Sequence, residues 1–450
     1  MKQYYFLITL FFFAPLVADE PLTLCDCQKE ALHHSQELSI AELQTMIAQE
    51  KIDEIRGINI PKISAEGTYN VRDKDQGFVR DNPLYHASPT IPRPDVNPLD
   101  IPEPPRRIKT ISAEKKYTSS KVSLIVPLYD CGHVNDMMQA QRSTVEATEH
   151  ERDRIQQDLL FAVADSYYRS LEGAKIEEVV LQSIKVLTQQ LATAKDLFSV
   201  GYVTKNEVLV VEVQLAQRQQ ELIQARHNIE SALASLSRLV GKKVERTAQL
   251  TDISREVQWK ETLATFYSRA DCCHPELKRI MANEKAAQAE LKAIRTEDYP
   301  RLSAFVNFNS SSDKFLLHKN WIHSGVGLTV PIFDGGIVDS KMAQKRKQID
   351  QLSLRYSQAV EDIHLRVQKA YLNVDSAYSR IPVALKSIEL AEENLKIDHD
   401  LFEEGMIMSD DVLNDEERLA QARSSYFQSL YSFQIAKSQL EYAAGLIALT

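Results

Sequence analysis

The heptapeptide "VPLYDCG", residues 126–132, returns with small changes as "VPIFDGG", residues 330–336. The two phrases are separated by 204 residues, and the same offset pairs Gly201 with Gly405. A fixed offset between similar segments is the mark of an internal duplication. The sequence therefore predicts one architecture built from two similar halves.

A second offset holds upstream of these phrases. "PKISA" (61–65) matches "PRLSA" (300–304) at an offset of 239 residues, which is 35 more than the first offset. The difference places an insertion in the first half, between Pro61 and Pro127. Residues 83–105 contain eight of the chain's 16 prolines. We therefore expect a tandem duplication with a proline-rich loop added to one copy.

Most of the chain between these landmarks has a helical pattern. Residues 133–200 contain no proline and one glycine, and their apolar residues step by four and three as in a coiled coil. A helix of that length would measure about 100 Å, whereas the helices expected over 206–239 and 26–59 would each measure about 50 Å. Two half-length helices could then stack along one long partner. Pro382 predicts a kink in the second long helix.

Four segments near the phrases alternate apolar and polar residues, over 62–71, 117–126, 301–309 and 322–330. Strands of about ten residues with this alternation have the length that crosses a bilayer in a β-barrel. Four ordinary half-buried strands in a soluble sheet are the alternative. Four strands alone leave open edges, which a bilayer does not tolerate, so a membrane barrel would require several copies of the chain.

Each phrase lies where a strand is expected to give way to a long helix. Pro127 and Pro331 lack an N–H group for the sheet and should stop the strands. Asp130 and Asp334 follow at the position where a carboxylate caps a helix N-terminus and suits the helix dipole. These four residues are our predicted strand-to-helix turns.

Composition and the cysteines narrow the function classes. The net charge of −10 disfavours nucleic acid as a partner. The apolar run after Lys2 resembles a signal peptide over residues 1–18. The five cysteines fit no zinc spacing well; a metal site, a bridge between the "CDC" (25–27) and "CCH" (272–274) segments, and lipidation of Cys25 are minor alternatives. We find no nucleophile–base set and no phosphate loop, so we expect no enzyme, cofactor or metal.

The two phrases, the tip segments "FSVGYVTKNEVL" (198–209) and "FEEGMIMSDDVL" (402–413), and the duplication together resemble the TolC-like outer-membrane efflux protein family. The resemblance implies a mainly α-helical homotrimer whose protomers each give four strands to one 12-stranded transmembrane β-barrel. Long-helix hairpins would form a periplasmic α-barrel, with an equatorial region around it. We expect a first repeat over 19–241, an equatorial linker over 242–271 and a second repeat over 272–450.

The resemblance also implies positions for a gate. The family has two aspartates three residues apart at its periplasmic mouth, and the matching residues here are Asp411 and Asn414, with Asp415 next to them. One acid is kept and one is lost. Because no Lys or Arg interrupts the acidic run around Asp411, we expect a cation-selective constriction; a solvated charged face is the alternative.

The chain reversals at the ends of the long helices are the expected docking surface for a periplasmic adaptor. The first tip contains Val200, Gly201, Tyr202 and Thr204, and the second contains Gly405, Met406, Met408 and Ser409. Both glycines would adopt the left-handed conformation of a helix C-terminus. The family usually has a basic residue four positions before each glycine, where this chain has Leu197 and Leu401.

The sequence thus predicts an outer-membrane exit duct of a tripartite efflux pump or type I secretion system. It would carry substrates passively from an inner-membrane pump to the exterior, in contact with outer-membrane lipid. Residues 75–115 would form an extracellular loop. The alternative is a soluble periplasmic coiled-coil adaptor or scaffold without a pore, which would not need the four amphipathic strands.

Overall fold

The structure is a computed structural model that describes residues 22–74, 76–82, 106–246, 250–252, 258–404 and 406–447. The expected signal peptide, the proline-rich residues 83–105 and Gly405 lie outside these ranges. No helix within them combines the length and the apolar character needed to cross a membrane.

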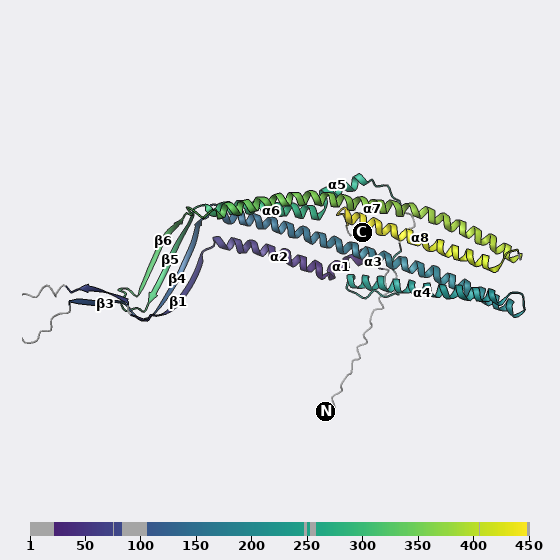
Figure 1. Cartoon of the computed structure of the whole chain (residues 1–450), viewed down its shortest axis with the longest axis horizontal. Coiled ribbons are helices and arrows are strands. Elements are labelled where there is room, and N and C mark those ends of the chain that lie inside the picture. Colours follow the sequence, from purple (N-terminus) through teal and green to yellow (C-terminus); the bar gives the residue numbers. More distant parts are fainter. Residues whose placement is uncertain are drawn as a thin grey trace, which may run out of the picture. The chain divides into compact units, whose positions relative to one another are not determined.

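The two halves contain the same series of elements (Figure 1). The first half consists of α1 (Leu24–His34), α2 (Gln36–Arg56), the 3-10 helix η1 (Gly57–Asn59), β1 (Lys62–Val71), β2 (Gln76–Asp81), β3 (Arg107–Ala113), β4 (Lys116–Tyr129), α3 (His133–Ser199) and α4 (Lys205–Val240). The second consists of α5 (Leu263–Cys273), α6 (Pro275–Arg295), η2 (Thr296–Asp298), β5 (Arg301–Ser311), β6 (Asn320–Thr329), α7 (Ile337–Glu403) and α8 (Ser409–Ala443).

The element boundaries follow the two offsets predicted from the sequence. Helices α1 and α5 begin and end 239 residues apart, and α3 and α7 begin and end 204 residues apart. Helix α5 is therefore the counterpart of α1, although it begins inside the segment 242–271 that we expected to be a linker. The structural repeat begins again at Leu263.

The single helix expected over 26–59 is wrong, because the chain breaks it at Ser35. The Ser35 N–H donates to Ala31 O at 2.9 Å, which ends α1, and the Ser35 Oγ accepts from the Leu38 N–H at 3.1 Å, which caps α2. His274 makes the equivalent break between α5 and α6. A serine is a preferred N-cap residue, so the signal was present in the sequence.

The long helices match the prediction closely. Helix α3 and helix α7 each contain 67 residues. Helix α7 continues through Pro382, so the missing N–H of this residue does not end the helix. The kink at Pro382 stays a prediction.

The chain forms two compact units, and each half of the sequence contributes to both. The helical unit contains the described parts of Met1–Ala48, Thr144–Glu284 and Asp350–Thr450. The sheet unit contains those of Gln49–Ser143 and Lys285–Ile349. The compact units thus differ from the two sequence repeats.

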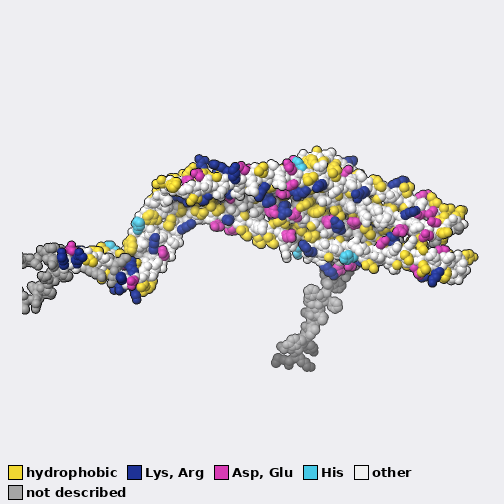
Figure 2. Space-filling view, in the orientation of Figure 1, with side chains coloured by type: hydrophobic (Ala, Val, Ile, Leu, Met, Phe, Trp, Pro, Cys, Tyr) yellow, Lys and Arg dark blue, Asp and Glu magenta, His cyan; other side chains and the backbone are white. Residues whose placement is uncertain are grey.

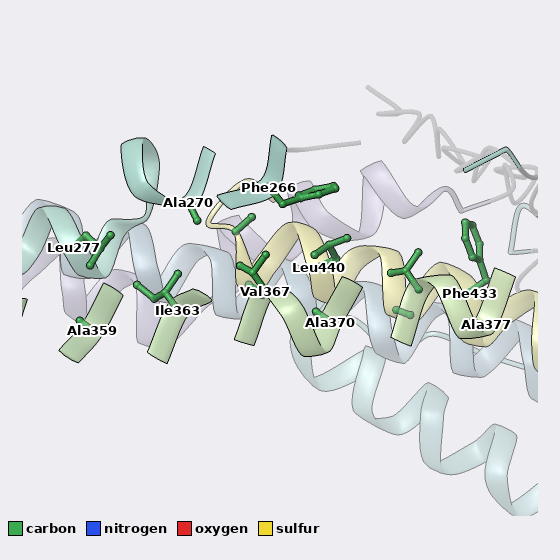
Figure 3. Packing of buried hydrophobic residues seen from close by; sticks show 14 of the residues in the cluster. Phe266, Ala270, Leu277, Ala359, Ile363, Val367, Ala370, Ala377, Phe433 and Leu440 are labelled. Carbon is green, nitrogen blue, oxygen red and sulfur yellow. The ribbon is translucent and has the colours of Figure 1, made fainter. Parts of the chain in front are cut away.

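Two equivalent hydrophobic cores stabilise the helical unit. In the second half, α5, α6, α7 and α8 meet around buried Phe266, Ala270, Leu277, Ile363, Val367, Phe433 and Leu440 (Figure 3). Several positions of α7 in this core are alanines, which allow close approach of neighbouring helices. The first half has its own core around Cys27, Ala31, Val163, Tyr167, Ile229 and Leu236.

The duplication extends to individual hydrogen bonds in the helical unit. The Tyr167 hydroxyl lies 3.1 Å from Leu22 O and 2.8 Å from Thr251 O. The Tyr371 hydroxyl donates to Glu261 O at 3.2 Å. Tyr371 is the counterpart of Tyr167 at the offset of 204, and Glu261 is the counterpart of Leu22 at the offset of 239. Each half therefore fixes the segment before its first helix to its long helix in the same way.

The sheet unit contains a four-stranded antiparallel sheet with strand order β1-β4-β5-β6. All four strands were predicted. The pairing leaves β1 and β6 as the two edges among the described strands. Apolar side chains of the edge strands remain exposed in the single chain, including Ile63, Tyr69, Ile322 and Val326. Exposed apolar residues on strands of this length suit a surface that faces lipid.

Residues 75–115 are more ordered than we expected. Strands β2 and β3 pair with each other in a separate two-stranded antiparallel sheet, so part of this segment is a hairpin rather than a loop. The prolines that argued against a strand are confined to residues 83–105, outside the described ranges. Strand pairing can continue up to such a segment because neither β2 nor β3 contains a proline.

The prediction that proline stops the strand is correct in one half and wrong in the other. Strand β6 ends at Thr329, before Pro331. Strand β4 passes through Pro127 to Tyr129, and its pairing with β5 shifts register between these two residues. An irregularity of this kind accommodates a residue that cannot donate to the sheet.

Candidate functional site

The strand-to-helix turns are built by the two aspartates predicted to cap the long helices. Asp130 accepts from the backbone N–H of Gly132 at 3.1 Å and of Val134 at 2.9 Å. Asp334 accepts from Gly336 at 2.8 Å and Val338 at 2.7 Å. These bonds from Val338 and Gly336 hold the pKa of Asp334 below its usual range. The capping prediction is confirmed in both halves.

The two turns differ at one residue that determines backbone strain. Cys131 has φ of 56°, the left-handed region, where the second half has Gly335 with φ of 72°. A side chain at this conformation costs roughly 1–2 kcal/mol. The Cys131 thiol lies 3.3 Å from Pro300 O, a weak hydrogen bond that offsets part of the strain.

We predict that Cys131→Gly raises the free energy of unfolding by about 1 kcal/mol, because glycine removes the left-handed strain. Thermal unfolding of the purified protein measures the change. Gly335→Ala is the matched variant and should lower stability by a similar amount, since a Cβ there meets no atom within 4 Å. A loss of stability in Cys131→Gly would contradict the prediction.

The first hairpin tip has the geometry predicted for it. Gly201 has φ of 78°, and the Tyr202 N–H donates to Leu197 O at 2.9 Å, closing the end of α3. Val200 and Tyr202 point to solvent, and the Tyr202 side chain is 83% exposed. Thr204 precedes α4 in an extended conformation. The tip therefore presents apolar side chains that nothing in the single chain covers.

The second tip repeats the closing bond. The Met406 N–H donates to Leu401 O at 2.9 Å, which is the counterpart of the Tyr202–Leu197 bond. Met406 is exposed, and Met408 is 77% exposed. The predicted left-handed glycine, Gly405, and the side chain of Ser409 lie outside the described residues.

The three predicted gate residues occupy different environments. Asp411 and Asn414 are exposed, whereas Asp415 is only 2% exposed. Asp411 Oδ2 lies 3.4 Å from the Met408 N, at the beginning of α8. Asp415 is held by Arg418 Nη1 at 2.7 Å and by the Asn394 amide of α7. Asp415 thus joins α7 to α8, and only Asp411 and Asn414 are available to solvent.

A further acid, Asp398 of α7, completes the contact with Asp415. A hydrogen bond from Asp398 to Asp415, together with the charges of Asp415 and Asp411, raises the pKa of Asp398, and Arg418 opposes the rise. Asp398 lies in the same acid-rich part of the sequence as Asp411, but the sequence alone does not indicate that Asp415 is its partner. The available signal was that Asn394 and Asp398 are four residues apart and share one face of the helix.

We predict that the α7–α8 contact loosens as pH rises from about 4 toward neutrality. A carboxyl whose folded pKa is raised binds its proton more tightly in the folded state. The stabilisation of the folded state by protonated Asp398 is therefore complete below the ordinary pKa of 3.8. This stabilisation is lost as the pH rises through the raised pKa. Hydrogen exchange of residues 394–418 should become faster over this range.

Asp398→Asn is the matched variant for this prediction. An amide can donate to Asp415 at every pH, so the exchange of residues 394–418 should lose its dependence on this carboxyl. Asp400→Asn, an exposed acid on the same helix, should behave as the wild type. Equal pH dependence in the wild type and Asp398→Asn would refute the role of Asp398.

The cysteines and histidines form no metal centre in the described parts of the chain. All five cysteines are free, so the bridge between the "CDC" and "CCH" segments is not formed. No group of three His, Cys, Asp or Glu side chains in the described residues is arranged to hold a metal ion. His34 lies 3.9 Å from Glu30 on the same helix.

Comparison with known proteins decides the family. The sequence profile of the outer membrane efflux protein family matches residues 28–242 and 266–446, which include both halves. The chain belongs to the outer membrane efflux protein family. This efflux protein is 22% identical over 336 residues to the alkaline protease secretion protein AprF of Pseudomonas aeruginosa, covering 73% of this chain and 69% of AprF.

Two further proteins are similar to this efflux protein. The pyoverdine export outer membrane protein OpmQ of Pseudomonas aeruginosa is 23% identical over 226 residues, about half of either chain (49% and 48%). The outer membrane protein VceC of Vibrio cholerae superposes with a TM-score of 0.71 at 16% identity, covering 94% of this chain and 96% of VceC. The fold class predicted from the sequence is therefore confirmed.

Family membership also determines location and class. The efflux protein is an outer-membrane channel, and its long helices are the periplasmic part of the molecule. The family consists of channels rather than enzymes. The alternative of a soluble adaptor or scaffold without a pore is wrong, because the family, the strands and the duplication all agree with a channel.

Proposed function

We propose that this chain assembles as a homotrimer that forms an exit duct for an efflux pump or a type I secretion system. The observation that carries the proposal is the four-stranded sheet with its unpaired edges, β1 and β6. An open edge leaves backbone N–H and C=O groups without partners, and lipid cannot supply them. Pairing β6 of one copy with β1 of the next satisfies both edges, and three copies would close a 12-stranded barrel.

Exposed apolar residues on two helices support the same assembly. Helix α2 leads into edge strand β1 and carries exposed Ile40, Leu43 and Ile47. Helix α7 follows edge strand β6 and carries exposed Leu354 and Leu372. Apolar stripes on single helices are stabilised when a partner helix covers them. In the proposed trimer these helices belong to the surfaces that meet a neighbouring copy.

The two hairpin tips are proposed as the docking surface for a periplasmic adaptor that links the channel to an inner-membrane pump. At each tip a backbone hydrogen bond caps the C-terminus of the long helix. Exposed apolar side chains follow it, Val200 and Tyr202 at one tip and Met406 and Met408 at the other. Crosslinking from Tyr202 and Met408 to a co-expressed adaptor tests the proposal. Contacts confined to residues outside the tips would refute it.

Asp411 is proposed as the main acid of a cation-selective constriction. It is exposed near the second tip, and threefold symmetry would turn one inward-facing acid into a ring of three. Asn414 would lie beside this ring, whereas Asp415 would support the α7–α8 contact. The inserted segment within 75–115 is proposed to be extracellular. The names of AprF and OpmQ differ in cargo, a protease and pyoverdine, so we assign the choice of cargo to the pump.

Two measurements test the function. Light scattering of the detergent-solubilised protein should give three chains per particle, and a monomer would refute the trimer. In planar bilayers under a KCl gradient, the reversal potential should indicate cation selectivity, which Asp411→Ala should reduce. Asp410→Ala removes a neighbouring exposed acid and is the matched control. An equal loss of cation selectivity in both variants would show that Asp411 is not the main acid of the constriction.

A further inference from the structure

Cationic residues outnumber acidic ones at the end of the four-stranded sheet where β1 ends and β4 begins. Six cationic residues gather there and are called the basic collar: Arg72, Lys74, Lys115, Lys116, Lys314 and Lys319. Figure 2 shows Lys and Arg side chains gathered in this part of the sheet unit. The concentration is notable in a chain whose net charge is −10.

Backbone pairing brings the collar together from three separate segments. The Arg72 N–H donates to Lys115 O at 2.7 Å, and Val71 pairs with Lys116 in the sheet. The Ser311 N–H donates to Lys319 O at 2.8 Å, which closes the turn that contains Lys314. The Ser312 N–H donates to Thr118 O at 2.9 Å and attaches this turn to β4. Backbone hydrogen bonds to the strands thus fix the position of each segment.

Acidic residues nearby neutralise only part of the collar. Glu114 pairs with Lys314 at 3.2 Å. Asp73 is exposed and stands between Arg72 and Lys74 in the sequence. Asp313 is buried, and its carboxylate accepts from the backbone N–H of Phe315 at 3.1 Å, so it serves the turn. Lys74, Lys115, Lys116 and Lys319 are exposed and form no ion pair in the described part of the chain. The collar therefore keeps a positive charge available to a partner.

Arg72 is held in position with part of its hydrogen-bonding capacity unused. Its Nη2 donates to the Tyr117 hydroxyl at 3.0 Å, and its guanidinium carbon lies 4.9 Å from the centre of the Tyr117 ring. Its Nη1 is buried and has no hydrogen-bond partner among the described residues. A guanidinium that is fixed on one side and unpaired on the other suits a phosphate oxygen.

Apolar side chains adjoin these charges. The turn between β5 and β6 carries exposed Phe315, Leu316 and Leu317, and Leu317 is 92% exposed. Lys314 precedes these residues, and Lys319 follows them closely. A surface that alternates ammonium groups with bare apolar side chains is complementary to a lipid head group and the beginning of its acyl chains. Free phosphate or an acidic protein would leave the apolar residues uncovered.

We propose that the basic collar binds the phosphorylated head groups of the outer-leaflet lipid. The helical part of the molecule is periplasmic and connects to the strands at their opposite ends, so the collar end of the sheet would face the exterior, where that lipid lies. Clustered Lys and Arg residues attract anionic lipid strongly, and Arg72 supplies a directed contact within the cluster. The collar would hold the channel at its depth in the membrane from the outside.

The test uses the full-length protein in detergent and diphosphoryl lipid A as the probe. A variant with K74Q, K115Q, K116Q and K319Q should bind the probe about tenfold or more weakly than the wild type. The matched control replaces four exposed lysines of the helical unit, K185Q, K260Q, K369Q and K396Q, and should bind as the wild type. Arg72→Lys keeps the charge but loses the planar fork, so a smaller loss is expected.

The proposal would be overturned by an equal loss in the control variant, by unchanged binding in the collar variant, or by equal binding of lipid A whose phosphates have been removed. Inorganic phosphate in excess should compete poorly if the lipid is the partner, and full competition would assign the collar to free phosphate instead. Particle mass is measured on the same samples, so a failure of the trimer is distinguishable from a failure of the collar.

Discussion

Replacing Phe433 with alanine is expected to lower the free energy of unfolding by about 3–5 kcal/mol, the range found when a buried phenylalanine is truncated. The Phe433 side chain is 2% exposed and belongs to the second-half core (Figure 3). Its ring centre lies 5.8 Å from that of Tyr378 and 6.4 Å from that of Trp259. Alanine would leave a cavity between the helices, and the variant would also lose these aromatic contacts.

The duplication supplies the matched control for this variant. Ile229 occupies the equivalent position of the first-half core and is equally buried. Ile229→Val removes one methyl group and should cost about 0.5–1.5 kcal/mol. Thermal unfolding followed by circular dichroism compares the two variants. A loss below about 1 kcal/mol for Phe433→Ala would mean that the second-half core does not hold the helices together.

Gly445→Ala is expected to destabilise the protein by about 2–5 kcal/mol. Gly445 has φ of 71°, and left-handed strain alone costs roughly 1–2 kcal/mol. A Cβ at this position would also lie 2.9 Å from His274 Cα and 3.0 Å from Pro275 Cδ. These atoms belong to the break between α5 and α6, so the clash cannot be relieved by rotating a side chain, and overpacking adds about 1–3 kcal/mol.

Gly201→Ala separates strain from clash. Gly201 has φ of 78°, yet a Cβ added there meets no atom within 4 Å. This variant should therefore lose only about 1–2 kcal/mol. The difference between the two thermal unfolding midpoints measures the contribution of the close contact at His274. Equal losses would show that the α5–α6 break is free to move away from Gly445.

Local rules predicted the repeating part of the fold well. The period of the apolar residues and the absence of helix-breaking residues determine helix α3, and the carboxylates of Asp130 and Asp334 act within four residues of themselves. The single helix expected over 26–59 was wrong because the local cap signal of Ser35 was missed. Another error arose where a partner strand overrides a local rule. Pro127 should end a strand, but β4 continues beyond it by pairing with β5, with a shift in register, after its pairing with β1 has ended at Ile125.

The environment of the acids near the second tip was less predictable. Asp411, Asn414 and Asp415 are neighbours in sequence, and nothing in their spacing distinguishes the exposed residues from the buried one. Asp415 is buried and contacts Asn394 of the preceding helix, and nearby Leu413 packs against Leu187 and Val211. Such contacts require the packing of several helices, which a single sequence does not specify.

The separate pairing of β2 and β3 has an evolutionary consequence. Strands β2 and β3 pair with each other and not with the four-stranded sheet. The two ends of the segment between Asp81 and Arg107 are therefore adjacent, because these two residues pair with each other. Changes in its length or composition leave the register of β1 and β4 unaltered, and they cost little in chain entropy. In the extracellular position that we propose for this segment, selection at the cell surface could therefore diversify it while leaving the four-stranded sheet unchanged.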